Sequence, residues 1–149
     1  MKWIRYIVIL LFLGASGAEH SLVAQEDPLF AQAIQSLEKT LSAMKDLRNR
    51  AEKSGKKEMV VYLNAKIGLG ETLLEVKKKQ MRLVVQLQKC EMALQALEKE
   101  ASEGDTEAIR KEQTLRRQIQ QLRQEEIQLQ QESVELLKQM AALKPSGGS

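Results

Sequence analysis

The residue types that most often perform chemistry in proteins are scarce in this chain and lie far apart. There is one histidine, His20, and one cysteine, Cys90. Metal sites and nucleophilic catalytic pairs need such groups to converge, and no further histidine or cysteine completes a set. The Gly68-Leu69-Gly70 segment lacks the third glycine of a dinucleotide-binding fingerprint and follows no predicted strand. We therefore expect no catalytic residues, no metal site and no cofactor, and we do not predict an enzyme.

Cys90 has two interpretations. A single cysteine cannot form a disulfide within its own chain. It falls on an apolar helical stripe, which favours a small, buried hydrophobic side chain. The alternative is an intermolecular disulfide across a homodimer, which an oxidising compartment would permit.

Charged side chains gather around two glycines, where they could bind other proteins. A basic cluster surrounds Gly55 and consists of Lys45, Arg48, Arg50, Lys53, Lys56 and Lys57. An acidic cluster surrounds Gly104 and consists of Glu98, Glu100, Glu103, Asp105 and Glu107. Both clusters can be read as solvated helix ends. They can also be read as candidate protein-interaction surfaces, for an oppositely charged partner or for head-to-tail association.

The N-terminus has the pattern of an export signal. A short basic start, with Lys2 and Arg5, precedes an unbroken apolar run over residues 7–13, and Ala18 fits a small-residue cleavage site. The run is too short for a membrane span, which needs about 20 apolar residues. We predict a cleaved signal peptide over residues 1–18, a periplasmic or secreted location, and no integral membrane span after cleavage. An uncleaved anchor is the alternative.

Cleavage would change the charge and the aromatic content of the protein. The net charge would fall from +3 to +1, because the signal contains Lys2 and Arg5 but no acidic residue. Phe30 and Tyr62 would be the remaining aromatic residues. A nearly neutral chain with two aromatics has little to attract or stack nucleic acid, so we do not expect a nucleic-acid partner.

The longest periodic stretch predicts a long helix with helical neighbours. A first heptad stripe comprises Met59, Tyr62, Lys66, Leu69, Leu73, Val76, Gln80, Leu83, Leu87, Cys90, Leu94, Leu97 and Ala101. A second heptad stripe beside it comprises Val60, Leu63, Ile67, Gly70, Leu74, Lys77, Met81 and Val84. Since the second stripe stops at Val84, the first half of this helix should need two neighbours and the second half one.

Two glycines interrupt this helix without breaking its periodicity. Gly68 and Gly70 each cost about 1 kcal/mol relative to alanine in a helix. The stripe passes through both without a change of phase, so we expect a continuous helix and a close helix approach at Gly70. A bend is the alternative.

Turn and capping residues define the remaining boundaries. Asp27-Pro28 is a helix start, with Asp27 as the N-cap, and Gly55 is a helix stop. Gly104 is followed by Asp105, a second N-cap. The predicted organisation is a signal peptide (1–18), a flexible lead-in (19–27), a helical coiled-coil domain (28–143) with helices over about 28–54, 57–102 and 106–143, and a flexible tail (144–149).

Short turns require antiparallel neighbours, which predicts an elongated all-α fold. Folding at Gly55 brings Pro28 level with about residue 82, close to where the second stripe ends. We expect an antiparallel three-helix bundle or coiled coil over residues 28–84 and 124–143. A two-helix hairpin over residues 85–123 should project from it by about 28 Å.

These features favour an exported, non-enzymatic interaction or scaffold module that uses the projecting hairpin. Its expected partners are other envelope or secreted proteins, with a homo-oligomer as a further possibility. One alternative is a periplasmic holdase-type chaperone, which would expose apolar surface to unfolded clients. The other is a helical subunit of a secretion apparatus.

Overall fold

The computed structural model describes residues 28–146. It contains three helices, α2 (Pro28–Lys53), α3 (Lys57–Ala101) and α4 (Thr106–Ala142), and no strand in the described range. Each helix begins at the predicted residue and ends one residue earlier than predicted. The signal peptide, the lead-in with His20 and Asp27, and residues 147–149 of the tail lie outside the described residues.

Both turns use a glycine in the left-handed region. Gly55 has φ +69° and Gly104 has φ +86°, conformations that cost a side-chain-bearing residue about 1–2 kcal/mol. After Gly104, the Asp105 carboxylate caps α4 and accepts hydrogen bonds from the backbone N–H of Glu107 at 2.9 Å and of Ala108 at 3.4 Å. These residues end α3 and start α4 within a few positions, so the two helices lie antiparallel.

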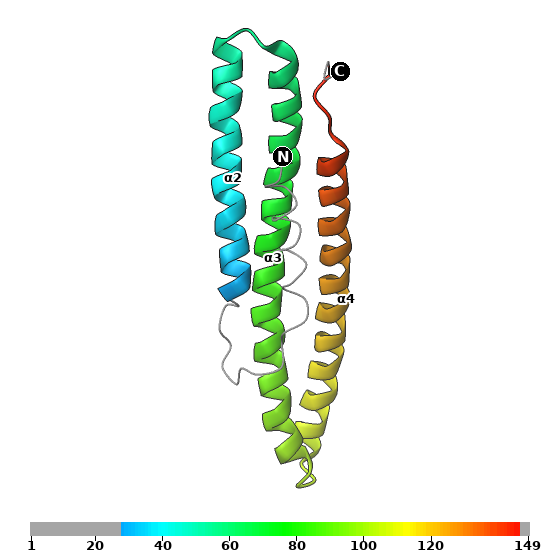
Figure 1. Ribbon diagram of the computed structural model, residues 1–149. Coiled ribbons are helices and arrows are strands. Elements are labelled where there is room, and N and C mark those ends of the chain that lie inside the picture. Colours follow the sequence, from blue (N-terminus) through cyan, green and yellow to red (C-terminus); the bar gives the residue numbers. More distant parts are fainter. Residues whose placement is uncertain (1–27, 147–149) are drawn as a thin grey trace.

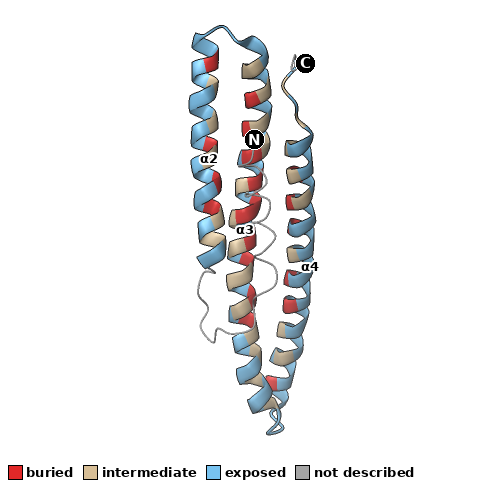
Figure 2. Ribbon diagram, viewed as in Figure 1, coloured by how far each residue is buried: buried red, intermediate tan, exposed pale blue. Residues whose placement is uncertain are grey.

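The long helix α3 lies between the other two helices and packs along both (Figure 1). The predicted all-α antiparallel bundle is therefore confirmed. Buried apolar side chains form one continuous core cluster along the rod (Figure 2): Leu37, Leu41, Leu73, Val76, Leu83, Leu87, Cys90, Ile119, Leu122, Leu129 and Leu136. Leu73 is the most deeply buried of these, at 1% exposure.

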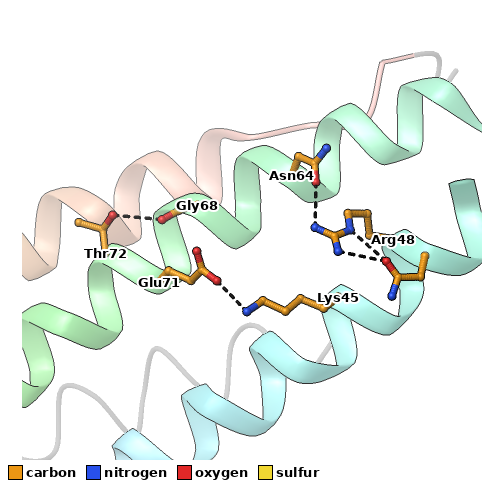
Figure 3. A network of polar contacts seen from close by, with 7 residues as sticks. Lys45, Arg48, Asn64, Gly68, Glu71 and Thr72 are labelled. Atoms are coloured by element: carbon orange, nitrogen blue, oxygen red, sulfur yellow. Dashed lines mark hydrogen bonds and ion pairs between the residues drawn. The ribbon is translucent and has the colours of Figure 1, made fainter.

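Two ion pairs and one amide contact link α2 to α3 outside this core, and Figure 3 shows the Lys45–Glu71 pair and the Arg48–Asn64 contact. Lys45 Nζ lies 2.7 Å from Glu71 Oε1, and Lys78 Nζ lies 3.2 Å from Glu38 Oε1. Nearer the turn, Arg48 Nη1 donates to Asn64 Oδ1 at 3.4 Å. Exposed pairs of this kind each contribute about 1 kcal/mol or less, so burial supplies most of the stability and the pairs help to set the register.

All three helices meet at Gly70. A Cβ added there would lie 2.6 Å from Leu41 Cδ2 on α2 and 3.6 Å from Met140 Cε on α4. By contrast, a Cβ at Gly68 would have no atom within 4 Å. The two glycines therefore differ: Gly70 permits the close approach, α3 continues through both as one helix, and Gly68 faces open space.

The helices are staggered, so all three run side by side only in the middle of the rod (Figure 1). With 37 residues, α4 is shorter than the 45-residue α3 and ends near the level of Gly70. Toward the Gly104 end of the rod, α3 extends past α2, because α2 begins partway along α3. The three-helix part is thus shorter than predicted at the Gly55 end, where α2 and α3 continue beyond α4 as a hairpin of their own.

The chain after α4 runs along this hairpin. Leu143 has an extended backbone, with φ −66° and ψ 127°. Pro145 and Ser146 then lie next to residues 55–59, with which they line a shallow depression. This part of the predicted tail therefore lies against the Gly55 turn.

Candidate functional site

Beyond the start of α2, α3 and α4 continue as the predicted two-helix hairpin, which we call the arm (residues 85–123; Figure 1). Close to the bundle, the arm has buried apolar residues, with Leu87, Ile119 and Leu122 each at most 8% exposed. Nearer the tip, Leu94 and Leu97 are only partly buried. The large apolar side chains of the arm are therefore less buried toward Gly104, although the small side chain of Ala108 beside the turn is 3% exposed.

One side of the arm is closed by ion pairs that repeat every seven residues. Arg123 Nη2 lies 2.9 Å from Glu91 Oε1, and Arg116 Nη2 lies 2.6 Å from Glu98 Oε1. Arg116 Nε also binds Glu112 within α4 at 2.8 Å, and this hydrogen bond is the main reason that the pKa of Arg116 is raised. Charged residues thus continue the line of the second heptad stripe beyond Val84, on a surface that α2 does not reach.

The arm also carries a shallow apolar groove near the tip, which we call the arm groove. Its apolar residues are Leu97 of α3 and Leu115 of α4. Its polar edge, all on α4, consists of Glu107, Arg110, Lys111, Thr114 and Gln118. Lys111 Nζ lies 2.8 Å from Glu107 Oε1, and the hydrogen bond to that carboxylate raises the pKa of Lys111. The groove therefore combines a half-buried apolar strip with an edge that contains both signs of charge.

The five acidic residues predicted as a contact surface have three different roles in the structure. Glu98 and Glu107 form ion pairs with Arg116 and Lys111, and Asp105 caps α4. Glu100 and Glu103 are exposed and form no ion pair within the described residues. These two carboxylates are therefore available at the tip for another molecule.

The basic cluster lies at the opposite end of α3 (Figure 1). Lys45 and Arg48 contact α3, as described above. The other four, Arg50, Lys53, Lys56 and Lys57, are exposed and form no ion pair in residues 28–146. The fold therefore keeps the two clusters apart and does not combine them into one site.

Cys90 lies inside the core cluster and is 9% exposed. This environment matches the small, buried hydrophobic side chain expected from its heptad position. A disulfide to a second molecule would require α3 and α4 to separate at this level. That alternative stays a prediction.

Three polar residues are buried in the three-helix part of the rod. Lys77, Gln80 and Ser133 are 7%, 5% and 3% exposed. Burial lowers the pKa of Lys77, and Gln80 Oε1 has no hydrogen-bond partner in the described structure. The sequence carried a signal for two of them, because Lys77 and Gln80 occupy positions of the heptad stripes, but periodicity alone does not say whether such a side chain reaches solvent.

The described residues contain no cluster of histidine, cysteine or carboxylate side chains suited to a metal ion. Within the same residues, no helix combines the length and the apolar character needed to cross a membrane.

Comparisons with known proteins do not assign the chain to a family. No family model matches it, and no curated protein or solved structure matches it.

Proposed function

We propose that this is an exported, non-enzymatic interaction module in which the arm binds another envelope or secreted protein. The observation that carries the proposal is the incomplete burial of the arm's own core. Leu94, Leu97 and Leu115 occupy the inner face of the hairpin and yet remain partly exposed. In the middle of the rod, where α2 is present as a third helix, the equivalent position Leu73 is 1% exposed.

A helix from a partner would provide in the arm what α2 provides in the bundle. An amphipathic helix that binds in a groove typically buries apolar side chains at positions i, i+3, i+4 and i+7. The arm groove offers Leu97 and Leu115 to such side chains, and Arg110 at its edge can bind a carboxylate of the partner. Such a contact would bury a small area and could rearrange readily, as expected of a scaffold protein. Export is supported by the N-terminal sequence pattern.

The test compares two sets of charged substitutions on α4. Thr114→Glu with Gln118→Glu places two carboxylates in the arm groove. Gln113→Glu with Gln120→Glu places two carboxylates at exposed positions of the same helical segment outside the groove. We expect the groove variant to lose proteins captured by the exported wild-type protein, by at least about tenfold, because burying an unpaired charge opposes binding.

The matched variant should retain those proteins at wild-type levels. Equal retention by both variants would show that the arm groove is not the contact surface. Circular dichroism of each variant checks that α4 stays helical. A secretion-apparatus subunit would bind through the same groove, and the identity of the captured proteins distinguishes it from other scaffolds.

The chaperone alternative predicts a different result. Client binding by a holdase needs contiguous apolar surface, typically of several hundred Å². The large apolar side chains exposed in the described residues are spread along all three helices: Leu29, Leu47, Val61, Met92, Ile109 and Ile127. This distribution favours the interaction module. Suppression of the aggregation of several unrelated unfolded proteins, unchanged in the groove variant, would favour the chaperone instead.

A further inference from the structure

The Gly55 end of the rod is a two-helix end, and on the face beyond α4 only the short segment after α4 lies beside it. The helix α4 stops at Ala142, so the last part of α2 and the first part of α3 have no third helix beside them (Figure 1). Leu47 on α2 and Val61 on α3 are 50% and 68% exposed there. Leu47 lies among the basic residues of this end.

The charge around this face is strongly positive. Residues 45–57 contain six basic and two acidic side chains, a net charge of +4. Four of the basic side chains form no ion pair in the described structure, as shown above. A partner for this end should therefore present negative charge next to an apolar side chain.

The Gly104 tip of the same chain has that composition. Residues 98–107 contain five acidic side chains and one basic side chain, a net charge of −4. Ile109, in the first turns of α4, is 38% exposed beside the carboxylates of this tip.

We propose that the Gly55 end of one molecule binds the Gly104 tip of a second copy, so that the rods associate head to tail. The two surfaces differ and lie at opposite ends of α3, so the contact is heterologous. Such a contact leaves one free surface of each kind and allows further copies to add. The proposal does not depend on the arm groove, since it uses the two ends of the rod and needs no other protein.

The test is a charge exchange on the purified exported protein. The first variant carries Lys53→Glu, Lys56→Glu and Lys57→Glu, which makes both ends acidic. The second carries Glu100→Lys, Ser102→Lys and Glu103→Lys, at exposed tip positions outside the arm groove, which makes both ends basic. Sedimentation velocity and small-angle X-ray scattering over a range of protein concentrations measure the mass and the longest dimension.

The wild-type protein should grow with concentration in steps of about one rod length, or about 68 Å for the 45 residues of α3. Each variant alone should associate at least about tenfold more weakly, because like charges then face each other. An equimolar mixture of the two variants should restore association, now in alternating order. Raising the salt concentration from about 20 mM to about 500 mM should weaken wild-type association.

A control variant carries Lys79→Glu, Arg82→Glu and Lys89→Glu, the same change of charge at exposed positions in the middle of α3. It should associate like the wild type. A wild-type protein that stays monomeric throughout, or a mixture that fails to recover although each variant keeps its helix content, overturns the proposal. The proposal is also overturned if the basic end binds anionic lipid vesicles and the protein shows no self-association. Loss of the arm-groove partner alone would leave this result unchanged.

Discussion

At the scale of single residues, the two glycines inside α3 show how one residue type can serve two purposes. Gly70 lies where Leu41 of α2 and Met140 of α4 approach the backbone of α3. Gly68 is two positions away and faces open space. Helix propensity penalises both equally, by about 1 kcal/mol. Tertiary packing offsets the penalty only at Gly70.

Alanine substitutions at the two positions should therefore have opposite effects. Gly68→Ala should raise the free energy of unfolding by about 0.5–1 kcal/mol, since the added methyl group meets nothing and the helix gains propensity. Gly70→Ala should be less stable than Gly68→Ala by about 1–3 kcal/mol, because its Cβ would overlap the buried Leu41 side chain. Urea denaturation of both variants measures the difference. Equal stabilisation of both variants would mean that the Leu41 side chain of α2 moves aside at little cost in free energy.

Lys77 supplies a prediction that depends on pH. Burial lowers its pKa below the usual 10.5. Between the lowered value and 10.5, the unfolded chain binds more protons than the folded chain, so the contribution of Lys77 to stability becomes more favourable as pH rises. Lys77→Met should remove this dependence and raise the free energy of unfolding at neutral pH by about 1 kcal/mol or more.

The matched control is Lys79→Met, at an exposed position two residues away. It should keep the wild-type dependence on pH. Denaturation at about pH 7 and about pH 10 compares the three proteins, within the range where a lysine titrates. A Lys77→Met protein with the wild-type slope would show that the ammonium group of Lys77 is solvated in the folded state.

At the scale of elements, the number of neighbours that a helix has decides how many of its stripes are apolar. Two apolar stripes run along α3 as far as Val84, near the level where α2 begins. Past that level, Glu91 and Glu98 take the place of apolar residues and bind Arg123 and Arg116. The ion pairs let this side of the arm face water, since no helix covers it.

The start of α4 depends on a local interaction that can be removed without disturbing the core. Asp105→Ala should lower the free energy of unfolding by about 1 kcal/mol, because the backbone N–H groups of Glu107 and Ala108 lose their acceptor. Asp105→Asn should retain most of that stability, since its amide oxygen also caps. Glu103→Ala, at the exposed tip, should change stability by less than about 0.5 kcal/mol. Thermal denaturation ranks the three, and equal losses for alanine and asparagine would exclude the capping role.

At the scale of the whole molecule, the stagger should produce a gradient of local stability. The three helices cover one another only in the middle of the rod, and toward each turn the rod narrows to two helices (Figure 1). Backbone amides around Leu73 and Leu83 should therefore exchange with solvent most slowly. Amides near Leu97 and near Tyr62 should exchange faster, through openings of the two ends that cost less than global unfolding.

Hydrogen exchange followed by mass spectrometry measures this gradient. Peptides from the middle of α3 should be protected at least about tenfold more than peptides from its ends, a difference of about 1.4 kcal/mol in opening free energy. Uniform protection along α3 would mean that the rod opens as one cooperative unit. In that case the arm would not be the easily remodelled part that the proposed function requires.

The sequence by itself determined the elements of this protein and their order. Local interactions decide where the helices begin and end: the carboxylate of Asp105 caps α4, and Gly55 and Gly104 allow the turns. Short turns then impose antiparallel neighbours, and the length of the second heptad stripe tells where α2 must lie. The charged clusters at the two ends also follow from position along the chain.

Only the tertiary structure decided the register between helices and everything that depends on it. The end of α4 near Gly70, the pairing of Glu91 with Arg123 and the burial of Lys77 each follow from a register set by the summed packing of many side chains. A heptad pattern cannot specify that register, since a shift of seven residues leaves the pattern unchanged. For the same reason, the sequence predicted the arm but not the arm groove, whose Leu97 and Leu115 meet only once α3 and α4 are aligned.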